Sequence, residues 1–133
     1  MLSLGTLPLH HIAIKVNDLA VCETFYHQVL GLKIITHQRD AQGQVRSTWL
    51  ELGGAILMLE KTKKKKKVKA LDDPGHYLVA FQIKLSQRQS WHERLVQHQV
   101  DVSHTSNFSL YFADPEGNRL ALSHHPDPLN QVA

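Results

Sequence analysis

The sequence predicts an α+β fold built from two βαβββ modules. Two observations support this fold class. On either side of a lysine-rich stretch the chain follows the same order of a strand, a helix and three strands. Each half alone is also too small to bury a core of its own. We therefore expect a single domain over residues 9–125, with module one at 9–60, a linker at 61–74 and module two at 75–125.

The first half begins with a strand over residues 9–16 whose side chains alternate. One face of this strand carries apolar side chains, and the other carries His11, Ala13 and Lys15. Asp18 is a candidate N-cap for a helix over residues 19–30, and Gly31 provides the glycine that favours a helix end. Three further strands are predicted over residues 33–39, 45–52 and 55–60.

The second half repeats this order after the turn residues Pro74 and Gly75. A strand is predicted over residues 76–84 and a helix from Ser86 to about His98, with Ser86 and Gln89 as a capping box. Weaker strands follow at 100–105, 108–113 and 119–124. Both first strands place a histidine, a small residue and a long polar side chain on one face. Such a face suits the wall of a cavity better than a surface covered by a helix.

Charge and cysteine content limit the classes of partner and the compartment. Seven of the fifteen Lys and Arg residues lie within residues 61–69, and without them the net charge of +3 becomes −4. No aromatic residue interleaves these lysines, so we expect a solvated linker and no nucleic-acid partner.

The chain has no apolar run of membrane-spanning length, and residues 1–8 lack the pattern of a signal peptide. The single cysteine, Cys22, cannot form a disulfide framework, which leads us to expect a cytoplasmic protein.

Four motifs, in order along the chain, resemble the vicinal oxygen chelate superfamily of glyoxalase I, bleomycin-resistance proteins and extradiol dioxygenases. They are HIAIKVNDL at residues 11–19, FYHQVLGL at 25–32, GH at 75–76 and DPEGNRLAL at 114–122. The resemblance implies a glyoxalase/bleomycin-resistance-like fold in which two modules form one cup-shaped mixed sheet. It also implies a small-molecule substrate or ligand in the cup and a homodimer.

The resemblance further implies where a metal would bind. Metal-dependent members place one ligand on the first and the last strand of each module, and the first-strand ligands correspond to His11 and His76. The glutamates of the last strands correspond to Met58 and Ala121, so both are missing, whereas Glu60 shares the face of Met58. Under one hypothesis His11, His76 and Glu60 bind Ni, Zn, Mn or Fe as divalent ions. Glu60 would then also serve as the base of a metal-dependent lyase, isomerase or dioxygenase.

Under the other hypothesis the metal site has been lost, and the cup binds an antibiotic or metabolite without chemistry, as bleomycin-resistance proteins do. The residues Trp49, Met58, Tyr111 and Phe112 would then form the wall of the ligand site, and Lys15 is a candidate contact for a carboxylate or phosphate. The sequence leaves both hypotheses open. It contains no G-x-S-x-G nucleophile motif and no phosphate-binding glycine loop, which argues against hydrolase and nucleotide-binding classes.

Overall fold

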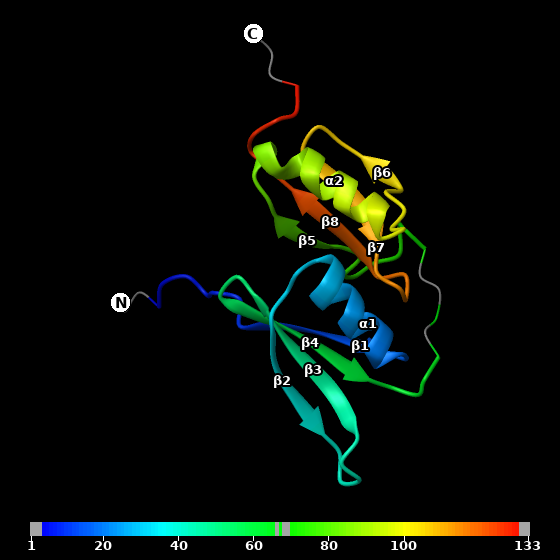
Figure 1. The fold of residues 1–133 in the computed structure, drawn as a ribbon. Coiled ribbons are helices and arrows are strands. Elements are labelled where there is room, and N and C mark those ends of the chain that lie inside the picture. The colour runs from blue at the N-terminus through cyan, green and yellow to red at the C-terminus, as the bar shows by residue number, and fades with distance from the viewer. Residues whose placement is uncertain (1–3, 66, 68–69, 131–133) are drawn as a thin grey trace. The chain divides into compact units, whose positions relative to one another are not determined.

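The chain forms two compact units, the first ending at Lys65, in a computed structural model that describes residues 4–65, 67 and 70–130 (Figure 1). Each unit holds one four-stranded mixed sheet, with the strand orders β1-β4-β3-β2 and β5-β8-β7-β6. In both sheets the first strand pairs in parallel with the last strand, and the remaining pairs are antiparallel. The predicted pair of βαβββ modules is thus confirmed.

Module one closely matches its predicted elements. It contains β1 (His11–Val16), α1 (Leu19–Thr24), a π-helical turn (Phe25–Val29), β2 (Ile34–Arg39), β3 (Val45–Leu52) and β4 (Ala55–Lys61). The Asp18 side chain accepts a hydrogen bond from the Val21 backbone N–H at 3.1 Å, as an N-cap does. Gly31 ends the helical segment with a φ of +76°, a conformation that a side chain disfavours.

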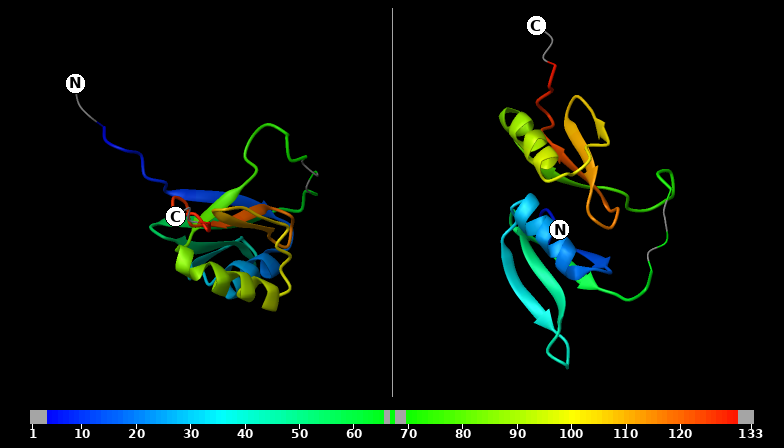
Figure 2. Two further views of the ribbon diagram at one scale, coloured as in Figure 1. Left: turned by 90° about the horizontal axis from the view of Figure 1, so that it is seen from above. Right: turned by 45° about the vertical axis from the view of Figure 1, so that its right-hand side comes forward.

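The core of module one lies between the sheet and the helical segment, which covers one face of the sheet (Figures 1 and 2). Fully buried side chains line both sides of this layer, namely Cys22 and Tyr26 from the helical segment and Leu50, Leu57 and Leu59 from the sheet. Because side chains alternate along a strand, the neighbours of these leucines project from the opposite face. That face carries the exposed residues His11, Ala13 and Lys15, as the sequence predicts.

Module two differs from its prediction at its first strand, at its helix start and at the strand predicted over residues 100–105, which covers only His104–Thr105. It contains β5 (Val79–Gln82), a 3-10 turn (Leu85–Gln87), α2 (Arg88–Gln97), β6 (His104–Thr105), β7 (Ser109–Ala113) and β8 (Arg119–Ser123). β5 is shorter than predicted because β8, the strand it pairs with, begins only at Arg119. The predicted Ser86–Gln89 capping box is wrong: the Lys84 backbone N–H donates to Gln87 Oε1 at 2.9 Å, and Gln89 instead contacts Glu93.

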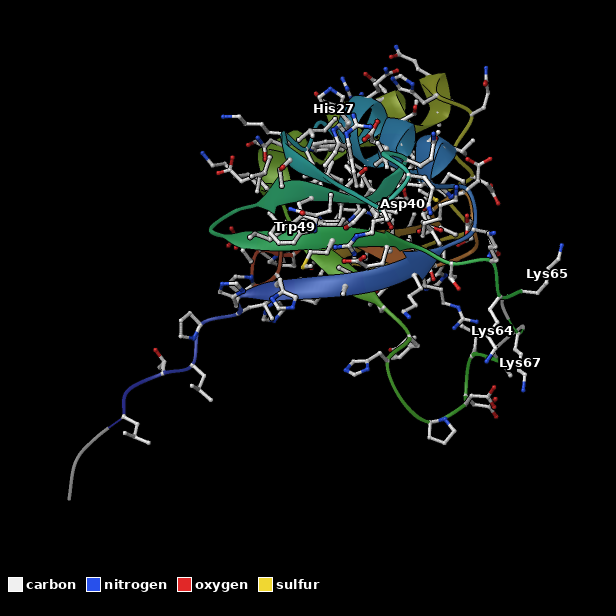
Figure 3. The ribbon with its side chains drawn as sticks, turned by 90° about the horizontal axis from the view of Figure 1, so that it is seen from below. His27, Asp40, Trp49, Lys64, Lys65 and Lys67 are labelled. Carbon is white, nitrogen blue, oxygen red and sulfur yellow. The ribbon has the colours of Figure 1, made fainter. Side chains whose placement is uncertain are left out.

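The lysine-rich segment leaves module one directly after β4. The Asn17 side chain donates hydrogen bonds to the backbone carbonyls of Thr62 and Lys64, at 2.9 and 2.8 Å, and so fixes the first turn of the segment. Lys64 and Lys65 lie on the loop that follows β4 (Figure 3), whereas residues 66, 68 and 69 of the predicted linker lie outside the described residues. None of the helices in the described part of the chain combines the length and the apolar character that crossing a bilayer requires.

Candidate functional site

Three rows of paired residues cross the open face of module one, which is the face opposite α1. Residues that pair across neighbouring strands share one face of a sheet. The rows, each running from β1 through β4 to β3, are His11–Ile56–Glu51, Ala13–Met58–Trp49 and Lys15–Glu60–Ser47. The face is therefore apolar in its middle row and carries ionisable groups in the rows on either side.

Trp49 and Met58 form the centre of this face. Both side chains are half-buried and lie next to each other across the β3–β4 pair. The indole Nε1–H donates to Ser47 Oγ at 3.0 Å, which fixes the ring along β3 (Figure 3). A fixed aromatic ring beside a flexible thioether is a surface that can take up a flat apolar molecule.

His11 lies in the first row and pairs with the residue before it. The Nδ1 atoms of His10 and His11 are 2.8 Å apart, and the two rings meet edge to face with centroids 5.1 Å apart. One of the two Nδ1 atoms must carry the proton and the other must accept it. His11 therefore already has a hydrogen-bond partner at Nδ1, and only its Nε2 remains for another ligand.

Glu60 lies in the third row, opposite Lys15. Its carboxylate is 3.9 Å from the Arg46 guanidinium, so cations flank it on both neighbouring strands. His11 is level with Ile56, and Glu60 lies four residues further along β4, about 13 Å at the usual rise per residue. The register thus does not bring His11 and Glu60 together.

Met58 occupies the position near His11 at which a carboxylate could coordinate the same metal ion as His11. Met58 is only two residues beyond Ile56, about 7 Å along the strand, and it offers a soft thioether in place of the carboxylate that the family resemblance implies. Within the described residues, no three His, Cys, Asp or Glu side chains lie where they could hold a metal ion. The donor set of module one therefore does not fit the predicted divalent ion.

The register of module two changes the predicted match between His11 and His76. In module one Met58 pairs with Ala13, and in module two Ala121, the residue matched to Met58, pairs with Ala80. Counting two residues back from these alanines gives His11 in module one and Leu78 in module two. The match to His76 is therefore wrong by two residues, because His76 lies before β5 on exposed chain. Its role as a metal ligand remains a prediction.

The two predicted aromatic wall residues of module two have different positions. Tyr111 pairs with Ala121 on the open face of the sheet, and its ring lies 5.4 Å from the His104 ring, centroid to centroid. Phe112 projects to the opposite face and is only 3% exposed, so its assignment to a ligand wall is wrong. The alternation along β7 allows only one of two consecutive residues to face a ligand.

Sequence reasoning missed a polar cluster on the helix-covered side of module one. The carboxylate of Glu23 on α1 accepts hydrogen bonds from His37 Nε2 on β2 and from the hydroxyl of Thr48 on β3. His37 and Thr48 are directly paired across the two strands. The sequence did contain a signal for this cluster. It was a glutamate next to the buried face of the predicted helix, together with two polar residues on the helix side of the predicted strands.

Comparison with known proteins identifies relatives over nearly the whole chain. The family model of the Glyoxalase/Bleomycin resistance protein/Dioxygenase superfamily matches residues 8–122. Over 118 residues the chain is 30% identical to the glutathione transferase FosA of Serratia marcescens, a match that covers 86% of this chain and 78% of FosA.

Two solved structures show that the fold is shared. A glyoxalase/dioxygenase from Nostoc punctiforme has a TM-score of 0.74 at 23% identity, covering 92% of this chain and 94% of the other. The fosfomycin resistance protein FosX from Listeria monocytogenes has a TM-score of 0.68 at 20% identity, covering 87% and 90%. The FosX structure contains Mn(II) and 1S,2S-dihydroxypropylphosphonic acid.

Proposed function

Because the chain belongs to the Glyoxalase/Bleomycin resistance protein/Dioxygenase superfamily, we propose that it binds a small organic molecule on the open face of module one without a metal. The observation that supports this proposal is the position of Met58. It lies between Ala13 and Trp49, where the family resemblance assigns a ligand glutamate. At that position the chain offers an apolar contact in place of a carboxylate.

The side chains of the face define the chemistry of the ligand. Its apolar body would stack on Trp49 and contact Met58, and burying a methionine side chain contributes about 1.5–3 kcal/mol. Lys15 at one end of the face supplies a cation for a carboxylate or phosphate, and His11 at the other end supplies a ring nitrogen. A ligand with a flat apolar centre and polar groups at both ends fits this order of contacts.

Trp49 fluorescence tests this proposal directly. The chain has two tryptophans, so the Trp91→Phe variant leaves Trp49 as its only indole. We expect metal-free bleomycin, which carries planar aromatic rings, to change this fluorescence along a saturating curve in the presence of chelator. Met58→Ala should weaken binding about tenfold because it removes the apolar contact.

The matched control is Val96→Ala, which removes an exposed apolar side chain from α2 in module two. It should leave the binding curve unchanged. A signal that requires added metal, or no saturable signal with bleomycin, would contradict the proposal.

A metal-dependent enzyme is the second candidate, and the 30% identity to FosA, which is named a glutathione transferase, favours it. In this case His11 would be one of the ligands, since it lies at a first-strand position that the family resemblance assigns to a ligand. The test is incubation of the purified chain with fosfomycin, glutathione and Mn(II), followed by phosphorus NMR. Conversion that is lost in His11→Ala would establish this candidate over the metal-free one.

A further inference from the structure

A pocket of about 640 Å³ opens on the helix-covered side of module one, away from the face that carries Trp49. Its volume lies in the range of small-molecule sites, about 300–1,000 Å³. One wall is the start of α1, the other is formed by β2 and β3, and Lys61 lines it from the end of β4. The side chains with ionisable groups that line it are Asp18, Glu23, His37, Arg39 and Lys61.

The polar cluster inside this pocket is held in one arrangement. Glu23 Oε1 accepts from the Thr48 hydroxyl at 2.9 Å and from His37 Nε2, and Thr48 itself is fully buried. A carboxylate that accepts from Nε2 keeps the proton on that nitrogen. In the neutral ring Nδ1 is then the hydrogen-bond acceptor. Glu23 thus acts as a positioning residue for the His37 ring.

The hydrogen-bond donors left for a ligand in this pocket are the cations Arg39 and Lys61, whose charges the carboxylates of Asp18 and Glu23 balance. The carboxylate of Glu23 is occupied by His37 and Thr48, and the carboxylate of Asp18 caps α1 through the Val21 N–H. Arg39 uses one guanidinium nitrogen to bond the Gly43 carbonyl, and its fork offers further N–H donors. Lys61 adds an exposed ammonium group at the end of β4.

We propose that this pocket binds a small organic anion that also carries a hydroxyl group. Its carboxylate or phosphate would bind to Arg39 and Lys61, since hydrogen bonds between ionised groups are the strongest that a protein offers. Its hydroxyl would donate to Nδ1 of His37. A phosphorylated alcohol or a hydroxy acid has this combination of groups.

Two matched pairs of probes test the proposal, each pair differing in hydroxyl groups at constant anionic charge. Glycerol phosphate is compared with propyl phosphate, and malate with succinate, by amide NMR titration of the full chain at constant ionic strength. We expect saturable shifts at Glu23, His37, Arg39 and Thr48, with the hydroxylated member of at least one pair binding several-fold tighter. The pair with the larger effect identifies the anionic group as phosphate or carboxylate.

Two variants separate the anion contact from the hydroxyl contact. Arg39→Gln should weaken both members of the preferred pair about tenfold, as loss of a charge-assisted hydrogen bond does. His37→Gln should instead remove only the advantage of the hydroxylated member. Lys33→Gln, which removes an exposed cation outside the pocket, should change neither binding constant.

The proposal is overturned if no probe gives saturable shifts in a chain whose amide spectrum shows it folded. It is also overturned if Arg39→Gln weakens binding no more than Lys33→Gln, because the anion would then respond to net charge alone. Equal affinity within both pairs would overturn the assignment of His37.

Discussion

Asp114 shows how a single buried carboxylate shapes module two. It lies at the turn between β7 and β8, is only 5% exposed, and accepts three hydrogen bonds from the turn that follows it. Two come from the backbone N–H groups of Glu116 and Asn118, both at 2.9 Å, and one from the Asn118 side chain at 2.8 Å. The turn therefore closes around this residue and holds the two central strands of the sheet in register.

Asp114→Ala should lower the free energy of unfolding by about 2 kcal/mol, because it removes the buried acceptor of three hydrogen bonds from partly buried N–H groups. Urea unfolding followed by Trp91 fluorescence in a Trp49→Phe background measures the loss in module two. Asp101→Ala removes an exposed carboxylate from the same module and should change stability by less than about 0.5 kcal/mol. An equal effect of the two substitutions would show that the turn does not depend on its buried acceptor.

Single residues also show which parts of the candidate site could be predicted from the sequence and which could not. The alternation of apolar and polar residues around Ile12 and Ile14 places His11 on the open face without any knowledge of the fold. The match to His76 failed because it depends on which residue of β5 pairs with Ala121. That register is set by contacts between strands far apart in the chain, and no local pattern reports it.

Among the elements, strand boundaries followed the sequence where turn residues mark them. Glycine-containing turns at Gly43 and Gly53-Gly54 separate β2, β3 and β4, and each of these strands was predicted to within one residue. β5 was overestimated because alternation continues through Tyr77 although the paired strand β8 does not reach that far. Tyr77 is 54% exposed, so an alternating pattern alone did not mark a buried face.

The lysine-rich segment is held to module one by hydrogen bonds from Asn17 to two of its backbone carbonyls. Replacing Lys63, Lys64, Lys65 and Lys67 with serine should change the free energy of unfolding by less than about 1 kcal/mol. The exposed charges contribute little, and the carbonyls that Asn17 binds are retained. Thermal unfolding of the variant and of the unchanged chain measures this difference in the free energy of unfolding.

Asn17→Ala is the matching test of the backbone contacts. It should lower the free energy of unfolding by about 1 kcal/mol or more, since it removes both hydrogen bonds to the segment.

Loss of cooperative unfolding in the serine variant would show that the lysine side chains themselves pack. The segment would then not be a linker.

At the scale of the whole molecule, each sheet has two edge strands, β1 and β2 in module one and β5 and β6 in module two. Unpaired backbone groups at such edges favour coverage by another chain, and a two-fold partner is the commonest solution. We therefore expect a homodimer. Sedimentation equilibrium at micromolar concentration should show a species of twice 15.1 kDa, and a single species of 15.1 kDa would contradict this expectation.

The two-module fold was predictable because duplication leaves the same order of elements twice in one sequence. The pocket that holds Glu23, His37 and Thr48 was not, because its three polar groups come from separate elements of module one. The family resemblance implies a ligand on the open sheet faces, and the residues at the ligand positions decide whether a metal takes part. There are four such positions, one on the first and one on the last strand of each module, and in this chain three of them carry Met58, Leu78 and Ala121.

Calorimetric titration of the chelator-treated chain with Ni(II), Mn(II), Fe(II) and Zn(II) at neutral pH tests the metal-free account most directly. With His11 as the single ligand at the matched positions, the account predicts no saturable heat with any of the four ions. Binding of one ion per chain that is lost in His11→Ala would contradict it.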